Sequence, residues 1–253
     1  MMISRKKYNF LKQFPNTLSE NEKAQVYEYE NSKIVIKYSI PEEKINTPLA
    51  YLPYKWLCDE FVKTWEANEK TKLILTEETK PIYRGITQYF ARLEVFESTK
   101  ITENIPKLNK GILIIGDYGC GKTSMLKSFK SVGDTLLPDP ILWFSKVSCN
   151  ALVADFEGLN SNDKSEKKYF FKKYNNAAVI YFDDFGTESN ASNFGIKNLL
   201  KDILEERYDN KKRTLLTSNL SLSEIEQKYG KRIFDRLQEM FNIIQMPGKS
   251  FRK

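Results

Sequence analysis

The sequence predicts an α/β fold in which a five-stranded parallel sheet lies between helices. From Lys110 onward, short apolar runs alternate with stretches whose apolar residues recur at helical spacing, which is typical of parallel strands joined by crossover helices. The runs are almost continuously apolar, as expected of strands covered on both faces. The expected strands are 111–115, 141–145, 178–182, 214–217 and 242–246, and the expected helices are 122–131, 150–158, 164–174, 192–209, 221–229 and 231–240.

Residues 1–100 precede this alternation and are expected to form a small α+β region that binds a partner. A domain over residues 101–253 would then hold the parallel sheet. Alternating apolar residues predict a β-hairpin at 26–40. Helical spacing predicts helices at 54–68 and 82–96.

The composition of the 253-residue chain restricts its chemistry. There is no histidine, which excludes imidazole acid–base catalysis, Ser-His-Asp triads and imidazole metal sites. Cys58, Cys120 and Cys149 are odd in number and lack metal-ligand spacing, so they suit a reducing cytoplasm. No apolar run is long enough to span a membrane. A net charge of +7 favours nucleic acid as partner, although a merely solvated lysine-rich surface has the same balance.

A phosphate-binding loop is the strongest chemical signal. Residues 116–123 fit G-x-x-x-x-G-K-[ST] directly behind the strand 111–115, and this context makes a chance match in a glycine-containing turn the weaker alternative. Lys122 is expected to reach the outer phosphates, and the Thr123 hydroxyl is expected to bind Mg²⁺. The expected nucleotide contacts are Gly116, Asp117, Tyr118, Gly119, Cys120, Gly121, Lys122, Thr123 and Ser124.

Polar residues end the two strands that follow in the predicted sheet. Asp183 and Asp184 come after the run 178–182, and Asn219 comes after 214–217. Because ligands collect at the carboxyl ends of parallel strands, Asp183 is expected to bind Mg²⁺ and Asp184 to orient or activate the attacking water. Asn219 is expected to hydrogen-bond the γ-phosphate or that water. Taken alone, each residue would be an ordinary polar cap at a strand end.

Arg232 and Arg236 are the expected partners of phosphate from a second subunit. They lie four residues apart and therefore share one face of the helix 231–240. A guanidinium group fits phosphate geometry, and an arginine supplied by a neighbouring protomer stabilises the charge of phosphoryl transfer. The alternative is that either arginine pairs along its own helix with Asp235 or Glu239.

The order of these motifs resembles the bacterial helicase loaders of the DnaC/DnaI type, which are AAA+ ATPases related to the transposition helper IstB. The resemblance covers about residues 108–253. Its segments are Gly116–Thr123, Asp183–Glu188, Glu206–Tyr208, Thr217–Ser221 and Tyr229–Leu237.

The resemblance implies an AAA+ P-loop fold without a helical lid domain, and it assigns roles to particular residues. The implied roles are Walker A for Lys122 and Thr123, Walker B for Asp183, sensor 1 for Asn219 and trans arginine finger for Arg236. Arg232 is a second candidate for the arginine finger, and Arg252 is similar to a terminal arginine of the family that faces nucleotide. Asp184 stands where AAA+ proteins usually have glutamate, which implies slow hydrolysis.

A basic, aromatic helix at 164–174 is a candidate for binding single-stranded DNA. Replication initiators and loaders have an extra helix near this place. Lysines interleave here with aromatic residues, a composition suited to phosphates and stacked bases. The alternative is a solvated helix whose aromatic residues pack inward. The residues are Lys167, Lys168, Lys172 and Lys173 with Tyr169, Phe170, Phe171 and Tyr174.

The resemblance implies a cytoplasmic ATPase that uses ATP and Mg²⁺, binds a hexameric replicative DNA helicase and single-stranded DNA, and associates with itself through the ATP site. Two alternatives stay open. One is an IstB-like transposition regulator that polymerises on duplex DNA. The other is a nucleotide-gated adaptor that binds ATP with little hydrolysis.

Overall fold

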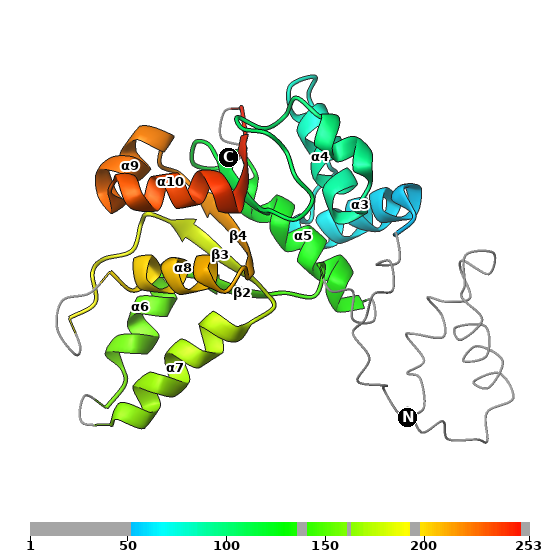
Figure 1. Cartoon of the computed structure of the whole chain (residues 1–253). Helices are drawn as coiled ribbons and strands as arrows, with labels where there is room; N and C mark the ends of the chain where they lie inside the picture. The colour runs from blue at the N-terminus through cyan, green and yellow to red at the C-terminus, as the bar shows by residue number, and fades with distance from the viewer. Residues whose placement is uncertain (1–51, 136–140, 161–162, 193–197, 249–253) are drawn as a thin grey trace, which may run out of the picture.

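One parallel sheet of five strands forms the centre of the computed structural model, which describes residues 52–135, 141–160, 163–192 and 198–248. The strand order is β2-β3-β4-β1-β5, and all four neighbouring pairs are parallel, which confirms the expected fold class (Figure 1). The strands are β1 (Gly111–Ile115), β2 (Ser145–Ser148), β3 (Val179–Phe185), β4 (Arg213–Ser218) and β5 (Phe241–Gln245).

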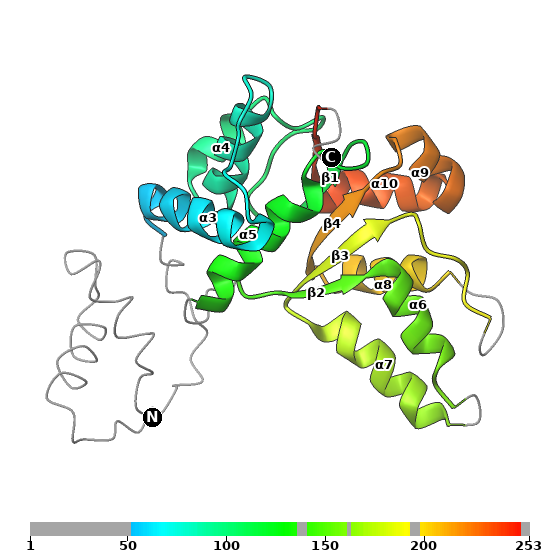
Figure 2. The same ribbon diagram turned by 180° about the vertical axis from the view of Figure 1, so that it is seen from behind.

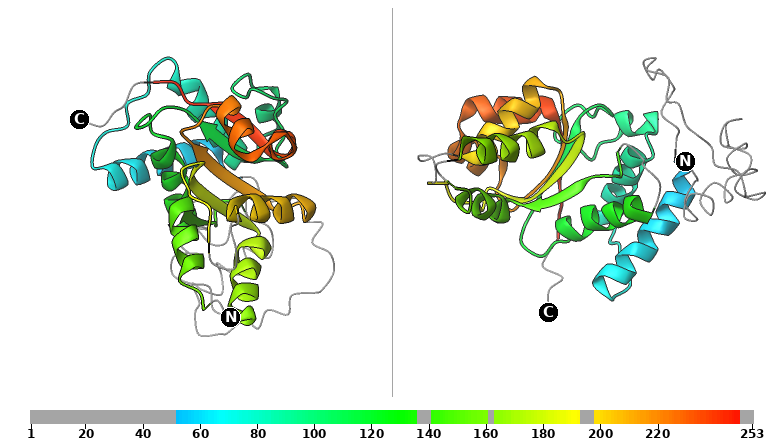
Figure 3. Two further views of the ribbon diagram at one scale, coloured as in Figure 1. Left: turned by 90° about the vertical axis from the view of Figure 1, so that its left-hand side faces the viewer. Right: turned by 90° about the horizontal axis from the view of Figure 1, so that it is seen from below.

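Helices cover both faces of the sheet (Figures 2 and 3). Across the described residues, no helix has the length and apolar character needed to cross a membrane. One face carries α3 (Tyr54–Glu69), α4 (Thr79–Phe90) and α5 (Lys122–Thr135). The other carries α6 (Cys149–Glu157), α7 (Lys164–Asn176), α8 (Leu199–Asp209), α9 (Leu222–Tyr229) and α10 (Lys231–Met240).

Alternate strand residues face two separate hydrophobic cores. In β1, Ile112 and Ile114 belong to the core shared with α3, α4 and α5. Leu113 and Ile115 belong to the core shared with the helices from α6 to α10. Side chains alternate between the two faces of a strand, so both sets must be apolar, which explains the uninterrupted apolar run.

The helices of the predicted N-terminal region pack directly on the sheet domain. Phe61 of α3 lies with its ring centroid 4.5 Å from that of Phe129 in α5. The Thr64 hydroxyl is 3.1 Å from the Ser128 carbonyl oxygen, to which it donates. Residues 52–98 therefore share one core with the sheet. The hairpin predicted at 26–40 lies outside the described residues.

The second strand differs from the expected 141–145. Ile141, Leu142 and Phe144 are buried, but they form the connection between α5 and the strand, and they pack into the core of α3, α4 and α5. The paired strand is the half-exposed β2, which lies at the sheet edge and pairs with β3 alone. The apolar run thus marked a buried loop, and the more polar residues after it form the strand.

Several expected helix boundaries are also wrong. The helix expected at 82–96 is α4, which takes Pro81 into its first turn, where a missing N–H is tolerated. It ends early because Arg92 has a left-handed φ of 57°, and a 3₁₀ helix, η2 (Glu94–Ser98), follows. The helix expected at 192–209 begins at Leu199, after Asn198 accepts a capping hydrogen bond from the Lys201 N–H.

Arg207, from the Glu-Arg-Tyr segment of α8, holds strand connections in place. It is fully buried, and its guanidinium donates to the carbonyl oxygens of Tyr174, Ala177 and Arg213 at 2.7, 2.9 and 2.6 Å. Its Nε also donates to the Thr214 hydroxyl at 2.9 Å. Burial lowers the pKa of Arg207 to about 10. This arginine therefore fastens the chain before β3 to the start of β4.

Candidate functional site

The phosphate loop leaves the carboxyl end of β1 and leads into α5. Two positions in this loop require glycine. A Cβ on Gly116 would stand 2.4 Å from the Met246 carbonyl oxygen, so no larger residue fits beside β5. Gly121 has a φ of 98°, a conformation that side chains disfavour, and it places Lys122 at the first position of α5.

Lys122 lies inside this loop with its ammonium group fully engaged. Its side chain is buried, with 4% of the residue surface exposed. The Nζ donates at 2.7 Å to the carbonyl oxygens of Gly116 and Asp117 and at 2.8 Å to the Asn219 side-chain oxygen. Cys120 Sγ lies 3.6 Å from the same nitrogen. The ends of β1 and β4 therefore converge on one buried cation.

Thr123 and Asp183 meet as the sequence predicted. The Thr123 hydroxyl donates to Asp183 Oδ1 at 2.8 Å. Two buried hydroxyls donate to the same oxygen, Thr217 at 2.6 Å and Tyr181. Three hydroxyl groups thus donate to Oδ1, and none of these three donates to Oδ2.

Lys146 of β2 forms an ion pair with Asp183 through Oδ2. The sequence analysis did not single out this residue. Its Nζ lies 2.7 Å from Asp183 Oδ2. Burial on its own raises the pKa of Asp183, but the hydrogen bonds from Lys146, Thr217 and Tyr181 and the Lys146 charge outweigh it, so the pKa lies below its usual value. The predicted strand 141–145 stopped one residue short of Lys146, so its place beside Asp183 was not foreseen.

Asp184 occupies an irregular point of β3. The β3–β4 pairing shifts register between Phe182 and Phe185, and Asp184 has a left-handed φ of 59°, which aspartate tolerates better than most residues. The Asn219 side-chain nitrogen donates to Asp184 Oδ1 at 3.2 Å. Because Asn219 also accepts from Lys122, it bridges the phosphate-loop lysine and this carboxylate.

The two arginines of α10 lie against α8 and not against Lys122 or Asp183. Arg236 Nη1 is 3.3 Å from Glu205 Oε1, and its guanidinium carbon is 4.8 Å from the Tyr208 ring centroid. Arg232, whose side chain is 74% exposed, has its Nε 3.5 Å from the same Glu205 oxygen. Both arginines thus pair with carboxylates of α8, Glu205 and Asp209, instead of with Asp235 or Glu239 along α10.

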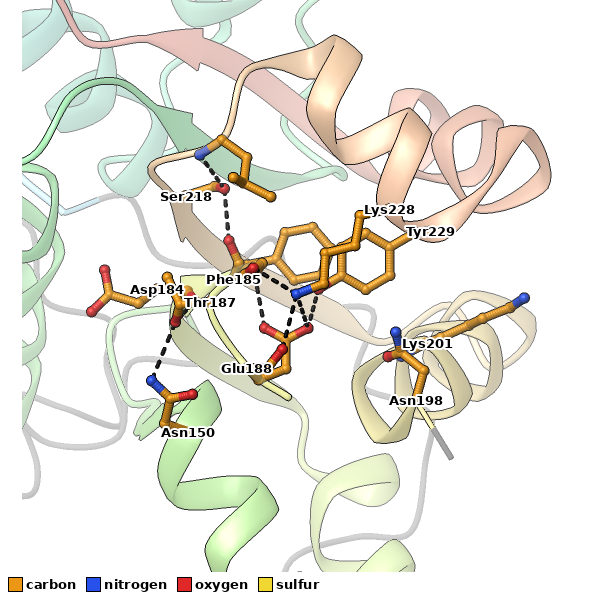
Figure 4. A network of polar contacts seen from close by, with 12 residues as sticks. Asn150, Asp184, Phe185, Thr187, Glu188, Asn198, Lys201, Ser218, Lys228 and Tyr229 are labelled. Atoms are coloured by element: carbon orange, nitrogen blue, oxygen red, sulfur yellow. Dashed lines mark hydrogen bonds and ion pairs between the residues drawn. The ribbon is translucent and has the colours of Figure 1, made fainter. Parts of the chain in front are cut away.

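A second buried carboxylate lies behind the Asp184 turn (Figure 4). Glu188 accepts from the Tyr229 hydroxyl and from the Gly186 N–H at 2.8 Å. Lys228 lies 3.8 Å from Glu188 Oε1. Glu188 and Tyr229 belong to two different segments of the family resemblance, and only the fold shows that they touch.

The basic helix α7 is partly as predicted. Phe170 and Tyr174 are buried, and Phe171 packs against the same core, so inward packing holds for these three aromatic residues. Tyr169 is 72% exposed. The lysines Lys168, Lys172 and Lys173 are exposed, and Lys167 is half-buried. Of the predicted site residues, Arg252 lies outside the described part of the chain, Tyr118 is exposed, and Ser124 is half-buried at the start of α5.

The fold and the loop define an α/β protein that carries a phosphate-loop motif at the carboxyl end of a strand in a five-stranded parallel sheet, and solved structures agree at the level of fold. No family model matches the chain, and no curated protein matches its sequence. The crystal structure of the DnaC helicase loader has a TM-score of 0.53 at 20% identity, covering 73% of this chain and 99% of that one. The crystal structure of DnaI has a TM-score of 0.50 at 17% identity, covering 79% and 94%. The resemblance to loaders of the DnaC/DnaI type is thus confirmed as a shared fold.

Proposed function

We propose that this protein is an AAA+ ATPase of the helicase-loader type, which binds ATP with Mg²⁺ and hydrolyses it slowly. The observation that carries the proposal is the meeting of Lys122, Asn219 and Asp184 in one hydrogen-bonded chain, with Thr123 on Asp183 beside it. These groups come from the carboxyl ends of β1, β3 and β4, where parallel sheets bind ligands. The shared fold with DnaC and DnaI supports the same class.

The residues present fit Mg²⁺ carried by a nucleotide. Among the described residues, no group of three or more acidic or cysteine side chains could hold a metal by itself. Mg²⁺ typically takes one or two carboxylates together with substrate phosphates, and Asp183 with the Thr123 hydroxyl supplies such hard oxygen ligands. When bound, the ion neutralises charge on the phosphates.

The remaining side chains have separable tasks in hydrolysis. Lys122 supplies positive charge inside the loop for the outer phosphates. Asp184 accepts a hydrogen bond from the attacking water and so orients it toward the γ-phosphate, and Asn219 holds the Asp184 carboxylate in place. Aspartate is one methylene shorter than the glutamate usual in AAA+ proteins, about 1.5 Å less reach. We therefore expect slow turnover.

Arg236, with Arg232 as second candidate, completes the site of a neighbouring protomer. Within one chain, both arginines contact α8, so they are available to the site only across an interface between copies. An arginine supplied in trans stabilises charge on the transferring phosphoryl group. Self-association through the ATP site follows from this assignment.

Single-stranded DNA is the proposed ligand of α7. Its exposed lysines Lys168, Lys172 and Lys173 would follow phosphates, and Tyr169 is the aromatic residue of this helix that is exposed for stacking. Replacing Tyr169 with alanine should weaken binding of a single-stranded oligonucleotide at least roughly fivefold, since stacking contributes about 1–3 kcal/mol per base. Trp143→Ala, which removes an exposed aromatic side chain outside both α7 and the phosphate loop, is the control. Unchanged DNA affinity in Tyr169→Ala argues against α7 as the DNA surface.

The partner is identified by a pull-down with the full chain. A hexameric replicative helicase and a transposase serve as alternative baits, each with ATP and without it, and residues 1–100 are the proposed helicase-binding region. Capture by the helicase that fails with Lys122→Ala supports the loader. Capture by the transposase alone supports the IstB-like regulator. If the helicase is captured only with ATP, and ATP turnover stays at background when DNA and helicase are present, the result supports the adaptor.

A further inference from the structure

Glu188 and Tyr229 form a buried contact that the proposed ATPase chemistry does not use. The Tyr229 hydroxyl donates to Glu188 Oε1, and both residues are buried. The Tyr229 ring also stacks on Phe185, with centroids 4.5 Å apart and an interplanar angle of 12°. Burial, followed by the charge of Glu188 and its hydrogen bond, raises the pKa of Tyr229. The hydroxyl therefore stays protonated and remains a donor.

The contact reaches the backbone of the turn that carries Asp184. The N–H of Gly186 donates to Glu188 Oε2 at 2.8 Å, and its carbonyl oxygen accepts from Lys228 Nζ at 2.6 Å. Lys228 also donates to the Glu188 carbonyl oxygen at 2.9 Å. The N–H and the carbonyl oxygen of Gly186 are thus hydrogen-bonded to Glu188 and to Lys228 at the end of α9, respectively (Figure 4).

Further hydrogen bonds join Thr187, the residue after Gly186, to Asp184. The Thr187 hydroxyl donates to the Asp184 carbonyl oxygen at 2.8 Å, and the Thr187 N–H donates to it at 3.2 Å. Asn150 of α6 in turn donates to Thr187 Oγ1 at 3.3 Å. Asp184 keeps a left-handed backbone, which is populated only where surrounding contacts support it. The turn and its supports therefore set the direction of the Asp184 carboxylate, which points away from Glu188 in Figure 4.

The other end of the contact sets the start of the arginine-bearing helix. Tyr229 is the last residue of α9, Gly230 follows, and α10 begins at Lys231. The Gly230 carbonyl oxygen accepts from the Phe234 N–H at 3.1 Å in the first turn of α10. One residue therefore separates Tyr229 from α10, and α10 carries Arg232 and Arg236.

We propose that the Glu188–Tyr229 contact is a positioning link between the Asp184 turn and α10. Nucleotide binding at a protomer's own site then moves the arginines that the same protomer presents to its neighbour. The link rests on the proposed function, since it joins the residues assigned to water orientation and to the trans site. A buried carboxylate is costly unless it is fully hydrogen-bonded, and an apolar pair would pack the same space without that cost. Packing alone does not account for this pair.

Hydrogen–deuterium exchange of the full chain tests the link without relying on turnover. Wild type, Tyr229→Phe and Glu188→Gln are compared with and without a non-hydrolysable ATP analogue and Mg²⁺. Tyr229→Phe keeps the ring stack and removes only the hydroxyl. Tyr89→Phe is the matched control, because it removes a buried tyrosine hydroxyl that donates to the Lys110 carbonyl oxygen at 2.7 Å in the other core.

In wild type, the analogue should slow exchange in the phosphate loop 116–124 and change exchange over 230–240. In Tyr229→Phe and Glu188→Gln, the phosphate-loop protection should stay within about twofold of wild type, while the change over 230–240 falls roughly fivefold, the effect of losing one hydrogen bond. Tyr89→Phe should behave as wild type. Analogue affinity should hold while kcat falls, because a positioning role acts on turnover and not on binding.

Three outcomes would overturn the link. The first is an undiminished change over 230–240 in both variants, and the second is an absence of that change in wild type. No phosphate-loop protection in wild type would remove the proposed function itself, and the link with it. If Tyr229→Phe does not fold, Lys228→Gln removes the charge 3.8 Å from Glu188 Oε1 and the ammonium donor to the Gly186 and Glu188 carbonyl oxygens, at the exposed end of the network. It should give a smaller loss in the same direction, with exposed Lys231→Gln as its control.

Discussion

Replacing Lys146 with methionine should tighten the binding of Mg²⁺ with nucleotide. Lys146 Nζ lies 2.7 Å from Asp183 Oδ2, the oxygen that the three hydroxyls on Oδ1 leave free. A divalent cation that uses Asp183 must therefore displace this ammonium group. Methionine keeps the length and apolar stem of the side chain and removes the competing charge.

The ion pair sets the size of the effect. Two unit charges about 4 Å apart attract by roughly 4 kcal/mol at an effective dielectric constant of about 20. The Lys146 side chain is 30% exposed and that of Asp183 is 7% exposed, so solvent screening and desolvation reduce the net value to about 1–2 kcal/mol. About 1.4 kcal/mol is a factor of about ten in affinity. The half-saturating Mg²⁺ concentration should therefore fall roughly tenfold.

The assay is a Mg²⁺ titration at a fixed concentration of a fluorescent, non-hydrolysable ATP analogue. Lys146→Arg keeps the charge and should need nearly as much Mg²⁺ as wild type. Lys164→Met, an exposed lysine at the first residue of α7, should leave the titration unchanged. An unchanged or higher Mg²⁺ requirement in Lys146→Met would refute the competition and would indicate that Lys146 contributes to nucleotide binding.

Three further substitutions separate binding, turnover and stability. Lys122→Ala should abolish ATP binding in a calorimetric titration, and tight binding in this variant would remove the central assignment. Asp184→Asn suits the left-handed backbone, so ATP affinity should stay within about twofold while kcat falls at least roughly a hundredfold; retained kcat would exclude Asp184 from orienting the water. Arg207→Met leaves three carbonyl groups without their donor, that of Tyr174 buried and those of Ala177 and Arg213 partly buried, and should lower the free energy of unfolding by about 3 kcal/mol. A thermal melt should show Tm lowered by roughly 6–12 °C, and an unchanged Tm would contradict this structural role.

The residues at strand ends were predictable from the sequence because two patterns coincide. The run 111–115 is apolar on both faces and leads straight into the phosphate loop, so Lys122 and Thr123 had a defined place. Asp183 and Asn219 follow similar runs, and the carboxyl ends of parallel strands meet at one edge. Their hydrogen bonds with Thr123 and Lys122 bear out that geometry.

The residues that the sequence missed depend on contacts between distant segments. Lys146 lies on an edge strand that is more polar than the apolar loop before it. The loop therefore matched the pattern of a buried strand better than the strand itself did. Tyr181 lies inside β3, where an apolar run predicts core packing and gives no sign that its hydroxyl reaches Asp183. Arg236 was weighed against acidic neighbours on its own helix, but packing of α10 on α8 brings Glu205 closer. Periodicity describes one element at a time and does not identify its neighbours.

Mixing two inactive variants tests the shared ATP site most directly. The Arg236→Ala protein retains Asp183 in its own site but supplies no arginine to its neighbour. The Asp183→Ala protein supplies Arg236 to its neighbour but lacks the metal ligand in its own site. If Arg236 acts in trans, about one interface in four of a random equimolar mixture joins an intact Asp183 to an intact Arg236. Turnover should then recover to about a quarter of the wild-type rate, although each variant alone stays at background. Background turnover at every mixing ratio would contradict a site completed by a second protomer.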